Sequence, residues 1–166
     1  FSATCNTWNS LSDEDKNSGL YQNPHGSELL YRWDMQATPP DILITNYSML
    51  EYMLLRGVDE GIFTKTRDWL ESNPNHIFTI VVDEAHSYSG TKGTEISYLL
   101  KRLLLRIGAK EHQVRFIATS ASLGADDSAQ RKARTFAARL FGADEKTFTV
   151  IQGKRWTPTP TAQNTS

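Results

Sequence analysis

The chain has 166 residues, 39% of them hydrophobic, which is the size of one domain with a single apolar core. Its 18 lysine and arginine residues nearly balance 19 aspartate and glutamate residues, so any contact with nucleic acid must be local. The single cysteine, Cys5, excludes an internal disulfide framework and fits a reducing compartment. Without a long apolar run or a signal-peptide pattern in residues 1–5, we expect a soluble, cytoplasmic protein with no membrane partner.

The beginning of the chain carries few signals of regular structure. Residues 1–26 are rich in Asn, Ser, Asp and Gly without a sustained hydrophobic period, which predicts a loop-rich leading segment. A short amphipathic helix is expected next, with Ser27 as its N-cap and its end before Pro39 and Pro40. Its apolar stripe consists of Leu29, Leu30 and Trp33.

The following segment has the pattern of a strand, a turn and a helix. Residues 41–45 form a short apolar run after the two prolines, as is typical of a buried parallel strand. Ser48 and Glu51 then match a capping box that opens a helix over residues 49–55. A further helix is expected around residues 66–70.

The middle of the chain has the clearest strand and helix patterns. Residues 77–82 are apolar almost throughout, which predicts a strand covered on both faces. A long amphipathic helix is expected between a Thr94 cap and Gly108, and residues 114–119 predict another strand. The helix carries its apolar residues at three-and-four spacing, namely Ile96, Leu99, Leu100, Leu103, Leu104 and Ile107.

The last part of the chain predicts a helix over residues 129–141 that stops at Gly142, then a final strand at 148–151. The tail, residues 157–166, alternates Thr with Pro, Ala and other small polar residues, which indicates a linker or a disordered end. Residues 27–156 are therefore expected to form the folded domain. Strands that alternate with helices predict a parallel sheet with helices on both faces, and ligands of such sheets bind at the carboxyl ends of the strands.

Two adjacent acids stand at the carboxyl end of the best predicted strand, in the sequence Asp83-Glu84-Ala85-His86. A nucleoside triphosphatase needs one carboxylate to hold hydrated magnesium and a second to orient or deprotonate the attacking water. Asp83 is our candidate for magnesium binding through water, and Glu84 for the water-positioning base. The alternative is structural, with Asp83 capping a turn and Glu84 solvated.

Hydroxyl groups follow the next predicted strand at Thr119, Ser120 and Ser122. Taken alone, this stretch has the composition of an ordinary polar turn. Its place at a neighbouring strand end makes it a candidate partner of the acidic residues.

Three stretches of the chain, in this order, resemble the motifs of DEAH-type superfamily 2 helicases. They are segment 39–51, the acidic motif together with residues 87–94 that follow it, and the hydroxyl-bearing turn. The resemblance covers about residues 32–153. Within this superfamily, the chain is similar to a bacterial branch that includes MrfA-type DNA repair helicases and helicases of some phage-defence systems. It implies the first RecA-like motor domain, of the P-loop NTPase class, and ATP-driven translocation on DNA with ATP and Mg²⁺ as cofactors.

The resemblance also implies roles for individual residues. Helicases of this superfamily carry Ser-Ala-Thr where this chain has Ser120, Ala121 and Ser122. In the family these hydroxyls bond to the acidic motif and link nucleotide state to strand movement, which assigns a coupling role to Thr119, Ser120 and Ser122. His86 is implied to link the acidic motif toward a second RecA-like domain.

Four residues are implied to contact nucleic acid. Thr45, Asn46 and Tyr47 match the place of a motif that touches the phosphate backbone of the tracking strand, which predicts salt-sensitive binding with little base specificity. The alternative is that they only cap the helix behind them. Lys92, between glycines, is implied to lie near DNA, with a solvated loop as its alternative.

An active motor also needs a phosphate loop, Gly-x4-Gly-Lys-Ser or Thr, and none of the ten glycines fits this pattern. The predicted RecA-like sheet is thus incomplete, with strand 114–119 open along one side. ATP and Mg²⁺ binding would require residues outside this chain, which we expect to be inactive alone. We expect a piece of a longer protein, although a domain that has naturally lost the loop is the alternative.

The sequence therefore favours part of an ATP-dependent DNA helicase or translocase, with DNA and a second RecA-like domain as partners. One alternative is a catalytically inactive helicase-like module that binds DNA or a protein. Another is a hydrolase that uses Asp83, Glu84 and His86 directly, which lacks a recognisable Ser or Cys nucleophile. DNA or RNA as the track, polarity, pathway and oligomeric state stay open at this point.

Overall fold

The computed structural model describes residues 2–18, 20–21, 23–29, 31–121 and 126–153. The chain divides into two compact units, the first formed by residues 1–80 and 98–117, and the second by residues 81–97 and 118–166. The expected tail at 157–166 and the predicted coupling residue Ser122 lie outside the described residues.

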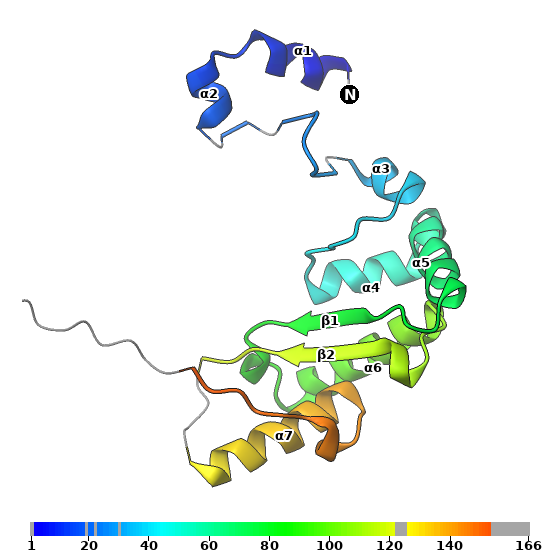
Figure 1. The fold of residues 1–166 in the computed structure, drawn as a ribbon, viewed down its shortest axis with the longest axis vertical. Coiled ribbons are helices and arrows are strands. Elements are labelled where there is room, and N and C mark those ends of the chain that lie inside the picture. Colours follow the sequence, from blue (N-terminus) through cyan, green and yellow to red (C-terminus); the bar gives the residue numbers. More distant parts are fainter. Residues whose placement is uncertain (1, 19, 22, 30, 122–125, 154–166) are drawn as a thin grey trace, which may run out of the picture. The chain divides into compact units, whose positions relative to one another are not determined.

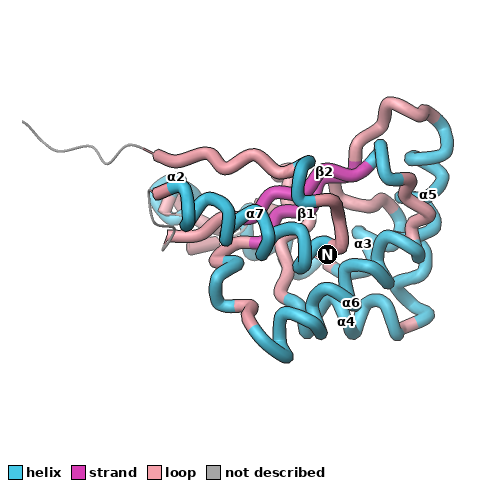
Figure 2. Tube along the Cα trace, turned by 90° about the horizontal axis from the view of Figure 1, so that it is seen from below, coloured by secondary structure: helices cyan, strands magenta, loops and turns pink. Residues whose placement is uncertain are grey.

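The described chain is α/β with a two-stranded sheet, in which β1 (Phe78–Val82) pairs with β2 (Val114–Ala118). Figure 1 shows both strands side by side and running in the same direction, and Figure 2 shows them adjacent from a second side. The connection between them contains α6 (Gly90–Arg106), as expected for a βαβ crossover. Two of the predicted strands, 77–82 and 114–119, are thereby confirmed to within one residue at one end each.

The apolar residues 77–82 predicted a strand with both faces buried, but the structure buries only part of the sheet. Ile80 and Val82 of β1 are buried, but Val81 between them is 58% exposed, so only one face of this strand is covered in the described structure. Ile117 of β2 is 42% exposed, and among the described strands β2 has β1 as its only neighbour. The open side predicted for residues 114–119 stays a prediction.

The first unit is mainly helical. It contains α1 (Ser2–Ser10), α2 (Asp13–Asn17), α3 (Arg32–Ala37), α4 (Tyr47–Leu55), η1 (Gly57–Asp59), α5 (Glu60–Ser72) and η3 (Glu111–Gln113), together with the last part of α6. Its core comes from α4, α5 and the predicted apolar stripe of α6, with Met53, Ile62, Phe63, Leu70, Leu99, Leu103 and Ile107 all buried. The buried Gln113 donates its side-chain amide to the Leu70 carbonyl at 2.8 Å and satisfies an acceptor near the end of α5.

The second unit holds η2 (Ala85–Ser87), the first part of α6, α7 (Asp127–Phe141) and η4 (Glu145–Thr147). As predicted, α7 ends at Gly142, which takes the left-handed conformation with φ 66° that glycine adopts without strain. Phe141 at the end of this helix is buried and stacks on Phe148, with ring centroids 6.0 Å apart.

Two predicted strands are wrong. Residues 41–45 and 148–151 are irregular in the structure. Ile42 and Ile44 are 80% and 92% exposed, so this apolar run has no strand beside it in the described structure. A strand needs a neighbour to satisfy its backbone groups, and an apolar run alone does not supply one.

Several helix boundaries also differ from the prediction. The capping box at Ser48 is wrong, because α4 begins at Tyr47 and is capped by Asn46, whose side chain accepts from the Met49 N–H at 2.8 Å. The Thr94 cap is wrong as well, since α6 already begins at Gly90, although its predicted stop at Gly108 is confirmed by a left-handed φ of 62°.

Four helices in the first half of the chain also depart from the prediction. The loop-rich segment 1–26 contains α1 and α2, the helix expected from Ser27 is α3, and the one expected at 66–70 is the longer α5. None of the helices in the described ranges has the length and hydrophobicity that crossing a bilayer demands.

Candidate functional site

The acidic motif follows β1 directly and turns sharply at its second residue. Glu84 has φ 47° and ψ 43°, and it is the only non-glycine residue with positive φ in the described chain. A left-handed conformation costs a non-glycine residue about 1–3 kcal/mol and persists only where the surroundings enforce it. Ala85, which begins η2, is 2% exposed and anchors the turn in the interior.

Backbone hydrogen bonds continue past the ends of both strands. The Thr119 N–H donates to the Val82 carbonyl at 3.0 Å, and the Ala85 N–H donates to the Thr119 carbonyl at 2.9 Å. These bonds bring the residue after β2 beside the acidic motif, all within the second unit. The predicted proximity of the acidic residues and the hydroxyl-bearing turn is therefore present, whereas the roles of these residues stay predictions.

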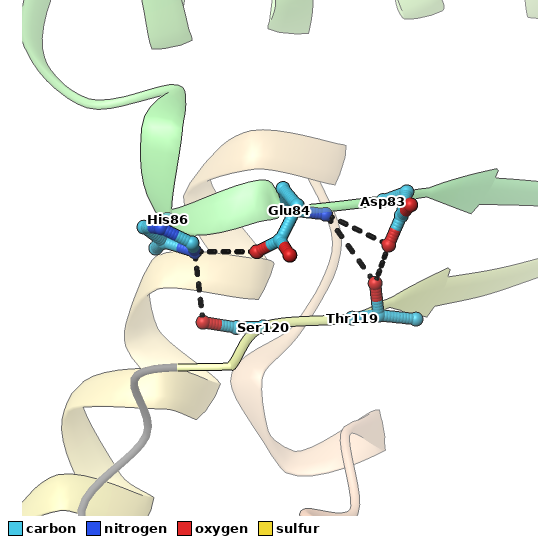
Figure 3. Close-up of polar contacts among 5 residues, drawn as sticks. All are labelled: Asp83, Glu84, His86, Thr119 and Ser120. Carbon is cyan, nitrogen blue, oxygen red and sulfur yellow. Dashed lines mark hydrogen bonds and ion pairs between the residues drawn. The ribbon is translucent and has the colours of Figure 1, made fainter.

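The hydroxyl of Thr119 holds the first carboxylate of the motif (Figure 3). It donates to Asp83 Oδ1, which also accepts the Glu84 N–H at 3.0 Å. The Glu84 N–H lies 3.3 Å from Thr119 Oγ1 as well, so Asp83, Glu84 and Thr119 form one hydrogen-bonded group. The Asp83 carboxylate is thus fixed in direction while the residue is exposed to solvent.

His86 joins the second carboxylate to the second hydroxyl. Its Nδ1 lies 3.1 Å from Glu84 Oε2 and 3.2 Å from Ser120 Oγ, and both contacts are drawn in Figure 3. A carboxylate only accepts hydrogen bonds, so this geometry favours a hydrogen on Nδ1. The Glu84 and His86 side chains are 57% and 45% exposed, which leaves room for a ligand beside them.

The structure places the hydroxyl of Ser120 beside His86. A serine hydrolase places its nucleophile and its orienting acid on opposite ring nitrogens of the histidine. Here Ser120 and Glu84 both face Nδ1. This arrangement argues against the direct hydrolase considered above.

The donor set fits a hydrated divalent cation that has further ligands. Asp83 and Glu84 supply the hard carboxylate oxygens that Mg²⁺ prefers, and Mg²⁺ in phosphoryl-transfer sites keeps waters and phosphate oxygens in its shell. Within the described residues no group of three or more His, Cys, Asp or Glu could hold a metal ion. The binding of Mg²⁺ by Asp83 through water stays a prediction that the chemistry of these two carboxylates permits.

Lys92 lies in the first turn of α6 and not in a loop. Its Nζ is 5.5 Å from the centroid of the Tyr88 ring, a cation–π distance. A Cβ on the next residue, Gly93, would clash with the Tyr88 carbonyl oxygen, a close backbone approach that sequence reasoning missed. Because the predicted helix began only at Thr94, Gly93 did not stand out as a glycine inside a helix, where it would indicate close backbone approach.

The predicted nucleic-acid residues 45–47 lie in the first unit, at the start of α4. Asn46 uses its side-chain oxygen to cap α4, and the Thr45 hydroxyl lies 3.4 Å from the Asn46 carbonyl. Tyr47 is 42% exposed. Asn46 thus caps α4, while contact with nucleic acid stays a prediction for all three residues.

Comparison with known proteins gives two relatives. The chain is 40% identical over 136 residues to the Druantia protein DruE of Escherichia coli (strain UMEA 4076-1), an alignment that covers 82% of this chain. It is 30% identical over 92 residues, 55% of this chain, to the uncharacterized ATP-dependent helicase MJ1574 of Methanocaldococcus jannaschii. These likenesses point to a helicase-related family. The aligned stretches span 7% and 12% of the lengths of the two relatives.

No protein-family model matches the chain, and no solved structure matches it at a significant level. The two relatives and the geometry of the strand ends are therefore the basis for the function.

Proposed function

We propose that the chain is part of an ATP-dependent DNA helicase or translocase, in which it supplies the Walker B acidic pair and the motif III hydroxyls of a first RecA-like domain. The proposal depends on one observation, the bonding of Asp83 to Thr119 and of His86 to Ser120 at adjoining strand ends. The similarity of this chain to a protein named as an ATP-dependent helicase supports the proposal. We assign residues 27–156 to the motor domain.

ATP with Mg²⁺ would supply the phosphoanhydride bond and the cation that neutralises its phosphates. Asp83, held by the Thr119 hydroxyl, accepts hydrogen bonds from water around the cation. Glu84 orients the attacking water and accepts its proton, with His86 fixing the direction of the Glu84 carboxylate. Through their contact, Ser120 and His86 would then transmit a movement of the end of β2 toward a second RecA-like domain.

Nucleic-acid binding is assigned to Thr45, Asn46, Tyr47 and Lys92. Backbone N–H groups at the start of α4 and exposed polar side chains there suit a sugar-phosphate backbone. Such contacts position a strand without reading its bases, which fits a translocase that moves along any sequence. DNA is the proposed track.

A second candidate function is a helicase-like module without catalytic activity that binds DNA or a protein partner. This candidate does not require a Gly-x4-Gly-Lys-Ser or Thr pattern, which these 166 residues do not contain. The motor proposal requires that the phosphate loop be contributed by residues outside the chain.

The test uses the protein made from the complete open reading frame that encodes this chain. We expect ATP turnover that a single-stranded oligonucleotide stimulates, and Glu84→Gln should lower it about 100-fold or more while nucleotide binding persists. The matched control is Glu95→Gln, which changes an exposed glutamate on α6 and should leave turnover unchanged.

The outcomes separate the two candidates. Oligonucleotide binding without ATP turnover in the unaltered protein would favour the inactive module. Turnover that survives Glu84→Gln would overturn the role assigned to the acidic pair.

A further inference from the structure

Asp59 is a charged residue with no exposed surface, which is costly unless its carboxylate is fully bonded. Its Oδ1 lies 2.9 Å from Arg32 Nε and 3.4 Å from Gln36 Nε2. Its Oδ2 has no hydrogen-bond partner among the described residues. A buried pair with one unbonded oxygen contributes little to stability, so its placement calls for another explanation.

The position of Asp59 in the chain makes this arrangement unusual. It is the last residue of η1 and stands at the N-cap of α5, where an aspartate normally accepts a backbone N–H of its own helix. Its side chain makes no such bond. The carboxylate points to Arg32 and Gln36 of α3 and ties α3 to the junction between α4 and α5.

Two further contacts hold α3 against α5. Lys65 Nζ donates to the carbonyl of Ala37, the last residue of α3. A Cβ on Gly61, in the first turn of α5, would stand 3.2 Å from the Gln36 carbonyl oxygen, so the two backbones approach closely there. A helix of six residues is not stable alone, and these contacts set its place.

The loop between α3 and α4, residues 38–46, depends on these anchors. Among the described residues its hydrogen bonds lie only at its two ends, where the Thr38 N–H donates to the Asp34 carbonyl at 2.8 Å and Asn46 caps α4. Its apolar residues Ile42 and Ile44 are largely exposed, so burial does not fix the loop either. The loop ends at the residues assigned to nucleic acid.

We infer that Asp59 is a positioning residue for nucleic-acid binding. Through Arg32 and Gln36 it fixes the start of loop 38–46, and through η1 it fixes the end of α4. Thr45, Asn46 and Tyr47 are thereby held in one arrangement that suits a sugar-phosphate backbone, which the buried Asp59 itself never touches. The inference rests on the proposed function, because it takes these three residues as the contact.

The experiment measures anisotropy of a fluorescein-labelled single-stranded DNA oligonucleotide with the protein from the complete open reading frame, at several salt concentrations. Asp59→Asn should weaken binding about tenfold, the effect of losing one hydrogen bond to a charged group, and leave the salt slope unchanged, because no lysine or arginine that contacts a phosphate is removed. Gly61→Ala, which pushes α3 from α5 without changing charge, should weaken binding in the same direction by a smaller factor.

Gln113→Ala is the matched control. It removes a buried polar side chain of η3 that donates to the far end of α5, and it does not touch α3 or the loop. It should destabilise the protein yet leave affinity and salt slope unchanged when folded protein is counted. Equal affinity losses in Asp59→Asn and Gln113→Ala, or no loss in Asp59→Asn, would overturn the inference.

One more variant separates this inference from the function beneath it. If Tyr47→Ala weakens binding and Asp59→Asn does not, only the positioning role fails. If the unaltered protein binds no oligonucleotide, the proposed function fails and the inference fails with it.

Discussion

The two regions assigned to function are held in different ways. At the ends of β1 and β2, backbone bonds between adjoining strands place Asp83 and Thr119 within direct reach of each other. In the first unit, loop 38–46 has no comparable bonds and takes its position from a helix that Asp59 and Lys65 hold. The site at the strand ends is fixed by its own residues, whereas loop 38–46 is fixed by residues outside the loop.

This difference predicts different responses to substitution. A change at the strand ends should act on the chemical step, because the altered group touches the acidic pair itself. A change at the anchors should act on binding and leave the chemistry intact. Variants that separate turnover, stability and affinity therefore test the comparison.

Among the residues that support the acidic pair, the largest effect is expected from Thr119→Val, which keeps the shape of the side chain and removes the hydroxyl that holds Asp83. Loss of a residue that orients a metal-binding carboxylate typically costs about 10- to 100-fold in metal affinity or activity. We expect turnover to fall by that factor and to need more Mg²⁺ for half-maximal rate. Thr119→Ser, which restores the hydroxyl, should recover most of the rate, and an unchanged Mg²⁺ dependence in Thr119→Val would contradict the role.

An intermediate effect is expected from Gly93→Ala at the start of α6. The added Cβ would clash with the Tyr88 carbonyl oxygen, so the backbone behind the acidic motif must move. Such overpacking costs about 1–3 kcal/mol, measured as the free energy of unfolding in urea. The control is Gly57→Ala, where a Cβ meets nothing within 4 Å and stability should hold. Equal stability of both variants would contradict a close packing of Gly93 against the Tyr88 carbonyl.

The same contrast explains what the sequence predicted and what it did not. Asp83, Glu84 and Thr119 were found because strand ends are marked by local apolar runs, and parallel strands bring their carboxyl ends to one edge. Asp59 gave no such signal, because its partner Gln36 is 23 residues away and only the packing of two helices joins them. Long-range pairing of polar side chains has no local period to detect.

The wrong strand at residues 41–45 has a related cause. The sequence shows correctly that residues 41–45 are apolar. Strand pairing, however, also requires a neighbouring strand, and the described structure places none beside these residues. Likewise Ser48 fits the capping pattern, yet Asn46 stands two residues earlier and reaches the Met49 N–H first. Propensity names candidates for a cap, and the backbone geometry selects among them.

The smallest effect, and the finest test of the comparison, comes from Asn46, which caps α4 and is also assigned to nucleic acid. Asn46→Ala should cost about 1 kcal/mol of stability through loss of the cap. Asn46→Asp keeps the cap and suits the helix N-terminus, so thermal unfolding should be unchanged, while its added negative charge repels a phosphate backbone. Oligonucleotide affinity should therefore fall severalfold in Asn46→Asp and rise again relative to the unaltered protein at high salt. If Asn46→Asp binds DNA as well as the unaltered protein at low salt, Asn46 is a cap alone, and the contact must be sought at Thr45 and Tyr47.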